Sequence, residues 1–460
     1  MSRVLILGAA PLPFEKKERQ YAANLRTWHF TKSILEDGHR VRLIACRLPN
    51  TYSREDDAEP WSVEQIGELE YLSVREAVFE NRSFIQQKME EFLPDVIVGV
   101  NTYPASRAAG LETDKPIWCD LNGWVMAEAQ AKTHVYQDNR YLSHFWKMEK
   151  AVLERADMIS TVSKAQAHAV IGELATLSRL GKETQGYPFV CTIPNALVEE
   201  EYDHGSNVIR GKLAEDDDFV VLWVGGYNTW TDVEMLYEAL ARAMSAVPEL
   251  RFVSTGGAID GHDEITFARF RERIAGGEFS DRVHFVGWVP TEEVPSYYFE
   301  ADLGLNVDGD NFETVYGARN RLNEMTKVGL PILTTVGTEI SQTLAERRLA
   351  LSSPIGEGRA FAEELIWAAG HRTEIAVMGQ QAREFAREEY SYSRTTRNLR
   401  SWVQAPSRAP DLARSVDLRD RDSIGGPTQE GESERNPSRF EGKQTSSREL
   451  WRRVLRAFGR

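Results

Sequence analysis

The sequence predicts an α/β protein made of two Rossmann-like, doubly wound domains that face one another across a cleft. Short apolar runs alternate with longer helical patterns, which is typical of a parallel sheet with crossover helices. Two such series follow one another along the chain, and a polar stretch separates them. Ligands of such sheets bind at the carboxyl ends of the strands, so both domains are expected to present loops to the cleft.

The expected boundaries follow from these runs and from local composition. The first domain covers 1–198 and the second 219–390, with a linker rich in Asp and Glu at 199–218 and a closing helix at 391–404. The expected strands are 3–7, 40–45, 96–100, 117–121, 158–162 and 190–193 in the first domain, and 219–224, 251–254, 283–286, 303–307, 332–335 and 349–352 in the second.

Composition and charge exclude several classes of protein. Of the 460 residues, 42% are hydrophobic and 27% are charged, and the net charge of −15 argues against general nucleic-acid binding. No apolar run is long enough for a transmembrane helix. The chain opens on an apolar strand without a signal-peptide leader, so a cytoplasmic location is expected. Cys46, Cys119 and Cys191 lack metal-ligand spacing, which favours buried, reduced thiols.

A helix is expected over 317–328, with Gly317 at its start. Leu322, Met325 and Val328 recur at three-residue spacing, and Gly329 follows as a stop signal. The element then runs directly into a strand of the second series. If its N-terminus faces the cleft, the free N–H groups and partial positive charge there suit a diphosphate.

Three charged residues of this helix are candidates for binding a nucleotide. Arg319 and Arg321 would add guanidinium donors to a diphosphate site, and Glu324 could accept hydrogen bonds from ribose hydroxyls. The alternative is a surface helix whose charges are simply solvated.

Glycines follow two strands of the second series. Glycine lets the backbone approach a phosphate closely, and Thr231 or Asp232 could cap the helix that comes next. A Gly-Gly turn is common, so the argument depends on finding it beside the charged helix. The candidate residues here are Gly225, Gly226, Tyr227, Asn228, Gly256 and Gly257.

In the first domain, a polar segment follows the strand that ends at 121. Asp120, Asn122 and Glu128 should face the cleft and are candidates for contacts with a ligand there, and the alternative is capping and turn chemistry. His134 and His144 are interpreted as surface or packing histidines rather than as a catalytic base.

The second half resembles the donor domain of GT-B glycosyltransferases, in particular the retaining, nucleotide-sugar-dependent family 4 group. The resemblance rests on the Gly-Gly loop, on Thr-Gly-Gly at 255–257, on Val-His-Phe-Val-Gly-Trp-Val at 283–289 and on Asn-Glu-Met-Thr-Lys-Val-Gly-Leu-Pro at 323–331. The last run places Glu324 at the second acid of the family's paired-glutamate motif. Including matches in the first half, the resemblance covers about residues 1–400.

The chain departs from the family pattern in two places. The position of the family's first glutamate is Tyr316, and Glu313 is the nearest acid, so Glu313 is the candidate for the sugar contact. The Gly-Gly loop has no Lys or Arg within 225–232, so Arg319 and Arg321 are expected to supply the missing positive charge. Without a cation beside the leaving diphosphate, the barrier would rise by several kcal/mol.

The resemblance implies transfer of a sugar from a nucleotide diphosphate to a hydroxyl of a glycan or lipid-linked acceptor, with retention and without a required metal. In that case Asp120, Asn122 and Glu128 are the candidates for contacts with the acceptor or with the donor's sugar. Asp308-Gly-Asp310 is the one candidate metal pair, and it is interpreted as loop. Two alternatives stay open: a GT-B epimerase or other non-transferring enzyme, and a non-catalytic nucleotide-sugar-binding scaffold.

The end of the chain differs from the rest in composition. Residues 405–444 are rich in Pro, Ser, Gly and charged residues, which predicts a disordered tether. Residues 445–460 set Trp451, Val454, Leu455 and Phe458 on one face among arginines. Such a basic amphipathic helix is expected either on an anionic membrane surface or docked on a protein.

Overall fold

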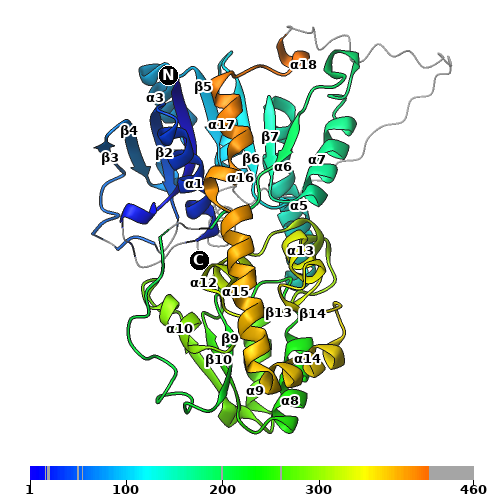
Figure 1. The fold of residues 1–460 in the computed structure, drawn as a ribbon. Helices are drawn as coiled ribbons and strands as arrows, with labels where there is room; N and C mark the ends of the chain where they lie inside the picture. The colour runs from blue at the N-terminus through cyan, green and yellow to red at the C-terminus, as the bar shows by residue number, and fades with distance from the viewer. Residues whose placement is uncertain are drawn as a thin grey trace, which may run out of the picture.

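The computed structural model describes residues 1–15, 17, 21–48, 51–53, 55–197, 200–259 and 262–413, which form two sheets flanked by helices (Figure 1). The first sheet has eight strands in the order β3-β4-β2-β1-β5-β6-β7-β8, all parallel except β3. Its strands are β1 (Arg3–Ala10), β2 (Arg40–Arg47), β3 (Trp61–Ile66), β4 (Leu69–Val74), β5 (Val96–Gly99), β6 (Ile117–Leu121), β7 (Met158–Thr161) and β8 (Val190–Thr192).

The second sheet has six parallel strands in the order β11-β10-β9-β12-β13-β14. They are β9 (Phe219–Trp223), β10 (Leu250–Thr255), β11 (Val283–Gly287), β12 (Leu303–Asn306), β13 (Ile332–Thr335) and β14 (Leu351–Ser353). The prediction of two doubly wound α/β domains is therefore confirmed, and every strand expected from the sequence is present.

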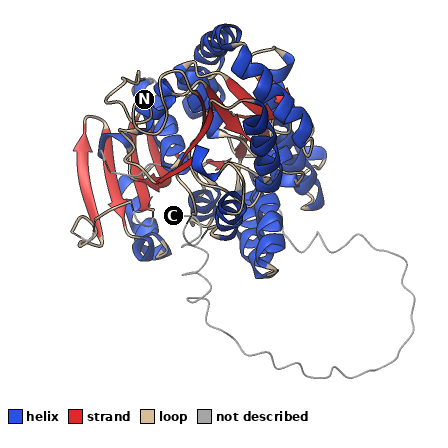
Figure 2. Cartoon of the chain, turned by 90° about the horizontal axis from the view of Figure 1, so that it is seen from below, coloured by secondary structure: helices blue, strands red, loops and turns tan. Residues whose placement is uncertain are grey.

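Helices cover both faces of each sheet (Figure 2). Successive side chains of a strand point to opposite faces of the sheet, so a strand that is apolar throughout needs a cover on both faces. In β1, Leu5 and Leu7 belong to one core cluster, whereas Val4 and Ile6 belong to the cluster on the opposite face. The helices around the first sheet are α1 (Ala22–Glu36), α2 (Glu76–Phe79), α3 (Arg82–Phe92), α4 (Thr102–Ala109), α5 (Val125–Tyr136), α6 (Arg140–Arg155) and α7 (Lys164–Thr176).

The helices of the second half continue to the end of the described chain. They are α8 (Val233–Ala246), α9 (Ile265–Ala275), α10 (Val294–Glu300), α11 (Phe312–Tyr316), α12 (Asn320–Val328), α13 (Glu339–Glu346), α14 (Gly358–Gly370), α15 (Arg372–Glu389), α16 (Tyr392–Thr395), α17 (Arg397–Gln404) and α18 (Pro410–Ala413). Short 3₁₀ turns occur at η1 (Pro13–Glu15), η2 (Lys182–Thr184) and η3 (Ser280–Arg282). In the described residues, no helix has the length and apolarity needed to cross a membrane.

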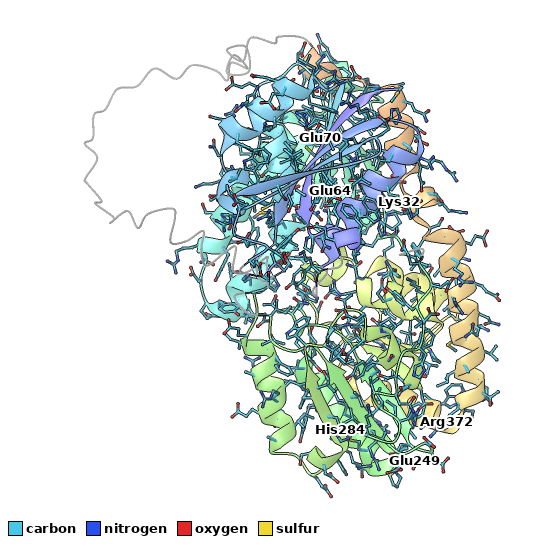
Figure 3. All side chains as sticks on the ribbon, turned by 90° about the vertical axis from the view of Figure 1, so that its left-hand side faces the viewer. Lys32, Glu64, Glu70, Glu249, His284 and Arg372 are labelled. Carbon is cyan, nitrogen blue, oxygen red and sulfur yellow. The ribbon has the colours of Figure 1, made fainter. Side chains whose placement is uncertain are left out.

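The β3–β4 hairpin is absent from the sequence prediction. All residues of β3 are exposed, because it is an edge strand that pairs antiparallel with β4 only. A strand without a buried face leaves no apolar run for a sequence pattern to detect, which explains the omission of β3. The omission of β4 has no such reason, because all of its residues except Glu70 are buried. Glu64 and Glu70 of this hairpin and His284 and Arg372 of the second half lie in opposite halves of the molecule (Figure 3).

The expected helix over 317–328 is wrong at its start. The Asn311 side chain accepts a hydrogen bond from the Thr314 N–H and caps a separate short helix, α11. Gly317 is extended, and α12 begins only after Arg319. The predicted end is confirmed, since Gly329 has a left-handed φ of 75° at the C-cap.

The last helices return to the first sheet. Leu399, Trp402 and Val403 are buried in a core cluster of that sheet, and the rings of Trp402 and Trp118 lie 5.4 Å apart. Arg400 on α17 pairs with Asp37 at the end of α1. Figure 1 shows α15, α16 and α17 as one orange column that runs along both halves.

The expected disordered tether does not begin at residue 405. The Ala409 N–H donates to Asp157 Oδ1 at 2.8 Å, and Arg179 pairs with Asp411 at 2.7 Å. Residues 405–413 therefore pack on the first half, because a few specific contacts can order a segment of polar composition. The rest of the expected tether, 414–444, and the expected amphipathic helix, 445–460, lie outside the described residues.

Candidate functional site

A cavity of about 530 Å³ lies between the two sheets and takes its walls from both. The carboxyl ends of the parallel strands face it, as expected for this architecture. Most residues that the sequence singled out line the cavity: Asn122, Glu128, Gly225, Gly226, Asn228, Arg319, Arg321 and Glu324. The remaining ones are not among its lining residues: Asp120, Tyr227, Gly256, Gly257, Glu313 and Gly317.

The Gly-Gly loop after β9 forms part of the second-half wall. Gly225 has a φ of 92°, a conformation that residues with a side chain rarely adopt. Gly256 supports this loop from behind, because a Cβ on Gly256 would lie 2.3 Å from the Gly225 carbonyl oxygen. The Gly257 carbonyl accepts a hydrogen bond from the Tyr227 N–H at 3.1 Å. Gly256 and Gly257 therefore shape the loop without lining the cavity.

Tyr227 belongs to the core of the second half. Its ring stacks on Trp223 at 4.6 Å, and its hydroxyl is 2.8 Å from Ser254 Oγ. Asp232 caps α8 as one of the two predicted candidates, since its Oδ1 accepts a hydrogen bond from the Met235 N–H. The sequence pattern thus located the loop correctly but overcounted the residues that reach the cavity.

Arg321 brings an unneutralised positive charge to the loop. Its guanidinium donates to the carbonyls of Val224 at 2.9 Å and Gly226 at 3.0 Å, and it lies 3.6 Å from the Trp223 ring centre. Among the described residues no carboxylate forms an ion pair with it. Burial lowers the pKa of Arg321 to about 10, so the side chain stays charged at neutral pH.

Arg319 is neutralised instead. Its guanidinium pairs with Asp308 at 2.8 Å and with Glu313 at 2.6 Å, and all three side chains are buried. Burial opposes the charge, yet the two carboxylates raise the pKa of Arg319 above its ordinary value. Burial also raises the pKa of Glu313. Glu313 therefore faces Arg319 and not the cavity, contrary to the expected sugar contact.

Glu324 follows Arg321 by three residues on α12, so both side chains lie on the same face of the helix and line the cavity. A Glu324 carboxylate oxygen accepts a hydrogen bond from the Tyr202 hydroxyl at 2.6 Å. The Lys327 ammonium lies 3.3 Å from the Tyr202 ring centre. Burial raises the pKa of Glu324, and the Tyr202 hydrogen bond and Lys327 oppose that shift.

The first-half wall uses two of the three expected polar residues. Asn122 lines the cavity and donates to Asn101 Oδ1 at 3.0 Å, and Glu128 lines it from α5. Asp120 is fully buried, where it accepts two hydrogen bonds from Arg26 and one from Ser160. Its polarity therefore serves a buried ion pair.

The two candidate histidines differ in position. His134 is exposed on α5, as interpreted from the sequence. His144 lines the cavity, and burial lowers its pKa to about 4, so it is neutral at neutral pH. Gly317 lies in a separate, smaller hollow with Ser163 and Asn195 at the contact between the two halves.

Sequence reasoning missed several lining residues. Glu76 on α2, Trp230 after the glycine loop and His262 before α9 all line the cavity. Lys132, one turn after Glu128 on α5, places its Nζ 3.4 Å from His262 Nδ1 across the two halves. Their spacing in the sequence gives no signal, because residues from distant segments meet only after folding.

The described residues contain no cluster of three or more His, Cys, Asp or Glu side chains placed to hold a metal ion. Asp308, one of the two acids of the predicted loop pair, is engaged by Arg319, and Asp310 is exposed.

Comparison with known proteins relates this fold to sugar-transferring enzymes. Residues 234–401 match the model of a family described as glycosyl transferase-like. The amylovoran biosynthesis glycosyltransferase AmsK of Erwinia amylovora is 27% identical over 137 residues, which make up 29% of this chain and 33% of that protein. The matched segment thus spans about a third of the length of this curated relative.

Solved structures are similar over most of the chain. Sucrose-phosphate synthase of Thermosynechococcus elongatus superposes with a TM-score of 0.64 at 15% identity and covers 88% of this chain and 98% of its own. HepE of Anabaena, solved in complex with UDP and glucose, gives 0.57 at 13% identity over 88% of this chain and 100% of its own. At these identities the likeness shows the fold, which is GT-B.

Proposed function

We propose that this GT-B protein is a glycosyltransferase that moves a sugar from a nucleoside diphosphate to a hydroxyl acceptor. One observation carries the proposal: Arg321, without a carboxylate partner in the described residues, lies beside a glycine loop and lines the same cavity as Glu324. The glycosyl transferase-like match over 234–401 includes α12, which bears both side chains.

The chemistry of sugar transfer needs positive charge at the leaving diphosphate. A guanidinium has five N–H donors, and the hydrogen bonds of Arg321 to Val224 and Gly226 use two of them. Oriented donors in a cavity that excludes water stabilise developing charge more strongly than they do in bulk water. Arg321 and the Gly225–Gly226 backbone would therefore hold the diphosphate, and Glu324 would accept hydrogen bonds from the ribose.

The acceptor would enter against the first-half wall, and retention of configuration without a required metal is part of the proposal. A carboxyl suited to an acceptor hydroxyl lies there, since Glu76 lines the cavity, as Tyr103 and Met148 do. The apolar and aromatic neighbours favour an acceptor with an uncharged body, such as a glycan or a lipid-linked sugar.

A thermal-shift panel tests the proposal first. The Tm of the protein is compared in the presence of UDP-, GDP-, ADP- and dTDP-sugars. Sugar nucleotides with one of these bases should raise Tm at millimolar concentration or below, and the others should not. The preferred donor is then incubated with candidate glycan acceptors, with and without EDTA, and release of the nucleoside diphosphate is measured. Turnover that needs no acceptor would indicate an epimerase or hydrolase, and binding without turnover would indicate a scaffold.

Residues 445–460 also carry a proposal that rests on sequence. We propose that this segment associates with anionic membrane surfaces, because helical spacing would place its apolar residues on one face among arginines. A peptide of these residues should bind anionic vesicles at low salt and lose that binding as salt rises. No binding at low salt would favour docking on a protein instead.

A further inference from the structure

The hydroxyls of the donor's sugar would need hydrogen-bond acceptors in the cavity, and the acids that the sequence singles out in the second half already have other partners. Glu313 is buried against Arg319, and Tyr316 contributes no carboxylate. Glu324 already accepts a hydrogen bond from the Tyr202 hydroxyl, and the proposed function assigns it to the ribose. Resting on the proposed function, we propose that Glu128 of the first half binds the hydroxyls of the donor's sugar and that this sugar is an uncharged one.

Glu128 lies close to the loop that would hold the diphosphate. Trp230 belongs to the same segment as Gly225 and Gly226, and its ring centre is 6.1 Å from that of His262. His262 Nε2 in turn lies 3.8 Å from Glu128 Oε1. A sugar attached to the diphosphate would therefore have Trp230 and Glu128 as neighbours, which combines an aromatic face with a hydrogen-bond acceptor.

The Glu128 carboxylate has capacity left for a ligand. Its Oε1 is buried and makes no hydrogen bond with the described residues. Burial raises the pKa of Glu128, and the nearby Lys132 ammonium opposes this shift. A buried acceptor without a hydrogen bond is unfavourable, so a ligand hydroxyl that donates to it contributes binding energy.

Lys132 and His262 are positioning residues for Glu128. Lys132 is 1% exposed and lies one helical turn after Glu128 on α5. An ammonium can only donate, so His262 Nδ1 at 3.4 Å accepts from it, and the imidazole proton is left on Nε2, toward Glu128. The second half thereby orients a carboxylate that belongs to the first.

The charges around this place decide the class of sugar. Arg319 lies 5.3 Å from the Trp230 ring centre, but Asp308 and Glu313 already neutralise it. Lys132 is the cation that acts on Glu128, so its single charge would be shared between Glu128 and a hexuronate placed beside it, and the hexuronate would bring a second negative charge. An uncharged hexose meets no such repulsion and offers hydroxyl donors to the carboxylate.

Calorimetric titration of Glu128→Gln with UDP, UDP-glucose and UDP-glucuronate tests the inference, with GDP and GDP-mannose as a second series. The affinity for the free diphosphate should stay within about twofold, and the ratio of sugar-nucleotide to diphosphate affinity should fall by about tenfold, the size of a hydrogen bond to a charged group. UDP-glucuronate should bind wild type less tightly than UDP-glucose, and the variant should reduce that difference.

A double mutant separates positioning from folding. Lys132→Met alone should lower the same ratio, whereas adding it to Glu128→Gln should change nothing further. Lys150→Met and Glu154→Gln, an exposed pair on α6, serve as matched controls. An unchanged ratio in Glu128→Gln, or an equal loss for diphosphate and sugar nucleotide, would overturn the inference. Failure of wild type to bind these five probes and also ADP- and dTDP-sugars would instead contradict the proposed function itself.

Discussion

The two walls of the cavity are built in different ways. The second-half wall comes largely from two compact segments, the loop after β9 and the start of α12, and it presents glycine backbone and charge. The first-half wall is assembled from separated segments, including 46–48, 101–104 and 122–128, and mixes apolar, aromatic and carboxyl groups. A wall built from neighbouring glycines and charges thus leaves a local mark in the sequence, whereas a wall assembled from distant segments leaves none.

The largest expected effect is the loss of stability on replacing Arg319, the neutralised arginine of the second-half wall. Arg319→Gln leaves the buried Asp308 and Glu313 carboxylates without their cation and should lower the free energy of unfolding by about 3–5 kcal/mol. Chemical denaturation measures it. The exposed pair of Arg359 and Glu363 is the matched control, because Arg359→Gln should change stability by less than about 1 kcal/mol. Equal losses in the two variants would show that Arg319 has no structural role.

Glu76 provides a pH test of the first-half wall. Burial, followed by the charge of Glu80, raises the pKa of Glu76 to about 7 from an ordinary value of 4.5. The unfolded state ionises first, so this group's stabilising contribution is full below pH 4.5 and is lost as pH rises to 7. Above pH 7, Glu76→Gln should therefore be more stable than wild type by up to about 3 kcal/mol.

The difference between Glu76→Gln and wild type should vanish near pH 4, where both side chains are neutral. Comparing the two proteins removes the pH dependence of all other groups. A difference that stays constant between pH 4 and pH 8 would mean that Glu76 ionises normally. Such a stability penalty at a cavity wall is typical of a group retained for function.

The sequence predicts the second-half wall better than the first-half wall, because the second-half wall comes from compact segments. Short-range sequence patterns predicted three features of the second-half wall correctly. These are the loop at Gly225 and Gly226, the end of α12 at Gly329 and the position of Arg321 beside the loop. The sequence did not predict the ion pair between Arg319 and Glu313, because Glu313 belongs to a separate short helix, α11, that folding brings next to Arg319. Two arginines that are equivalent in sequence are therefore both charged once folded, but carboxylates neutralise only Arg319 among the described residues.

Long-range assembly limits prediction elsewhere. The contact of Lys132 with His262 joins segments that are 130 residues apart. The contact of Trp402 with Trp118 likewise joins distant segments. The sequence predicted the helix that carries Trp402 but not the sheet on which it packs. Hydrophobic periodicity predicts which face of an element is buried but does not identify the element that buries it.

Arg321→Gln should affect ligand binding more than folding. Its side chain has no carboxylate partner in the described residues, so its removal leaves no buried charge behind. Affinity for the preferred nucleoside diphosphate should fall about 10- to 100-fold, the equivalent of about 1.5–3 kcal/mol for a charged hydrogen bond. Arg242→Gln, at an exposed position on α8, is the control. Unchanged affinity in Arg321→Gln would move the diphosphate away from the glycine loop.

The smallest expected effect concerns Glu324 and the ribose. Glu324→Gln keeps an oxygen that can accept from the Tyr202 hydroxyl, so the helix should fold normally. Wild type should bind the preferred nucleoside diphosphate more tightly than its 2′- or 3′-deoxy analogue, because a carboxylate accepts a stronger hydrogen bond than an amide does. In the variant this preference should shrink by about 1 kcal/mol, or roughly fivefold. The intact diphosphate site would keep the affinities for both analogues measurable. If the preference for ribose were the same in both proteins, the nucleoside would lie on another part of the wall, and Arg321 alone would define the second-half site.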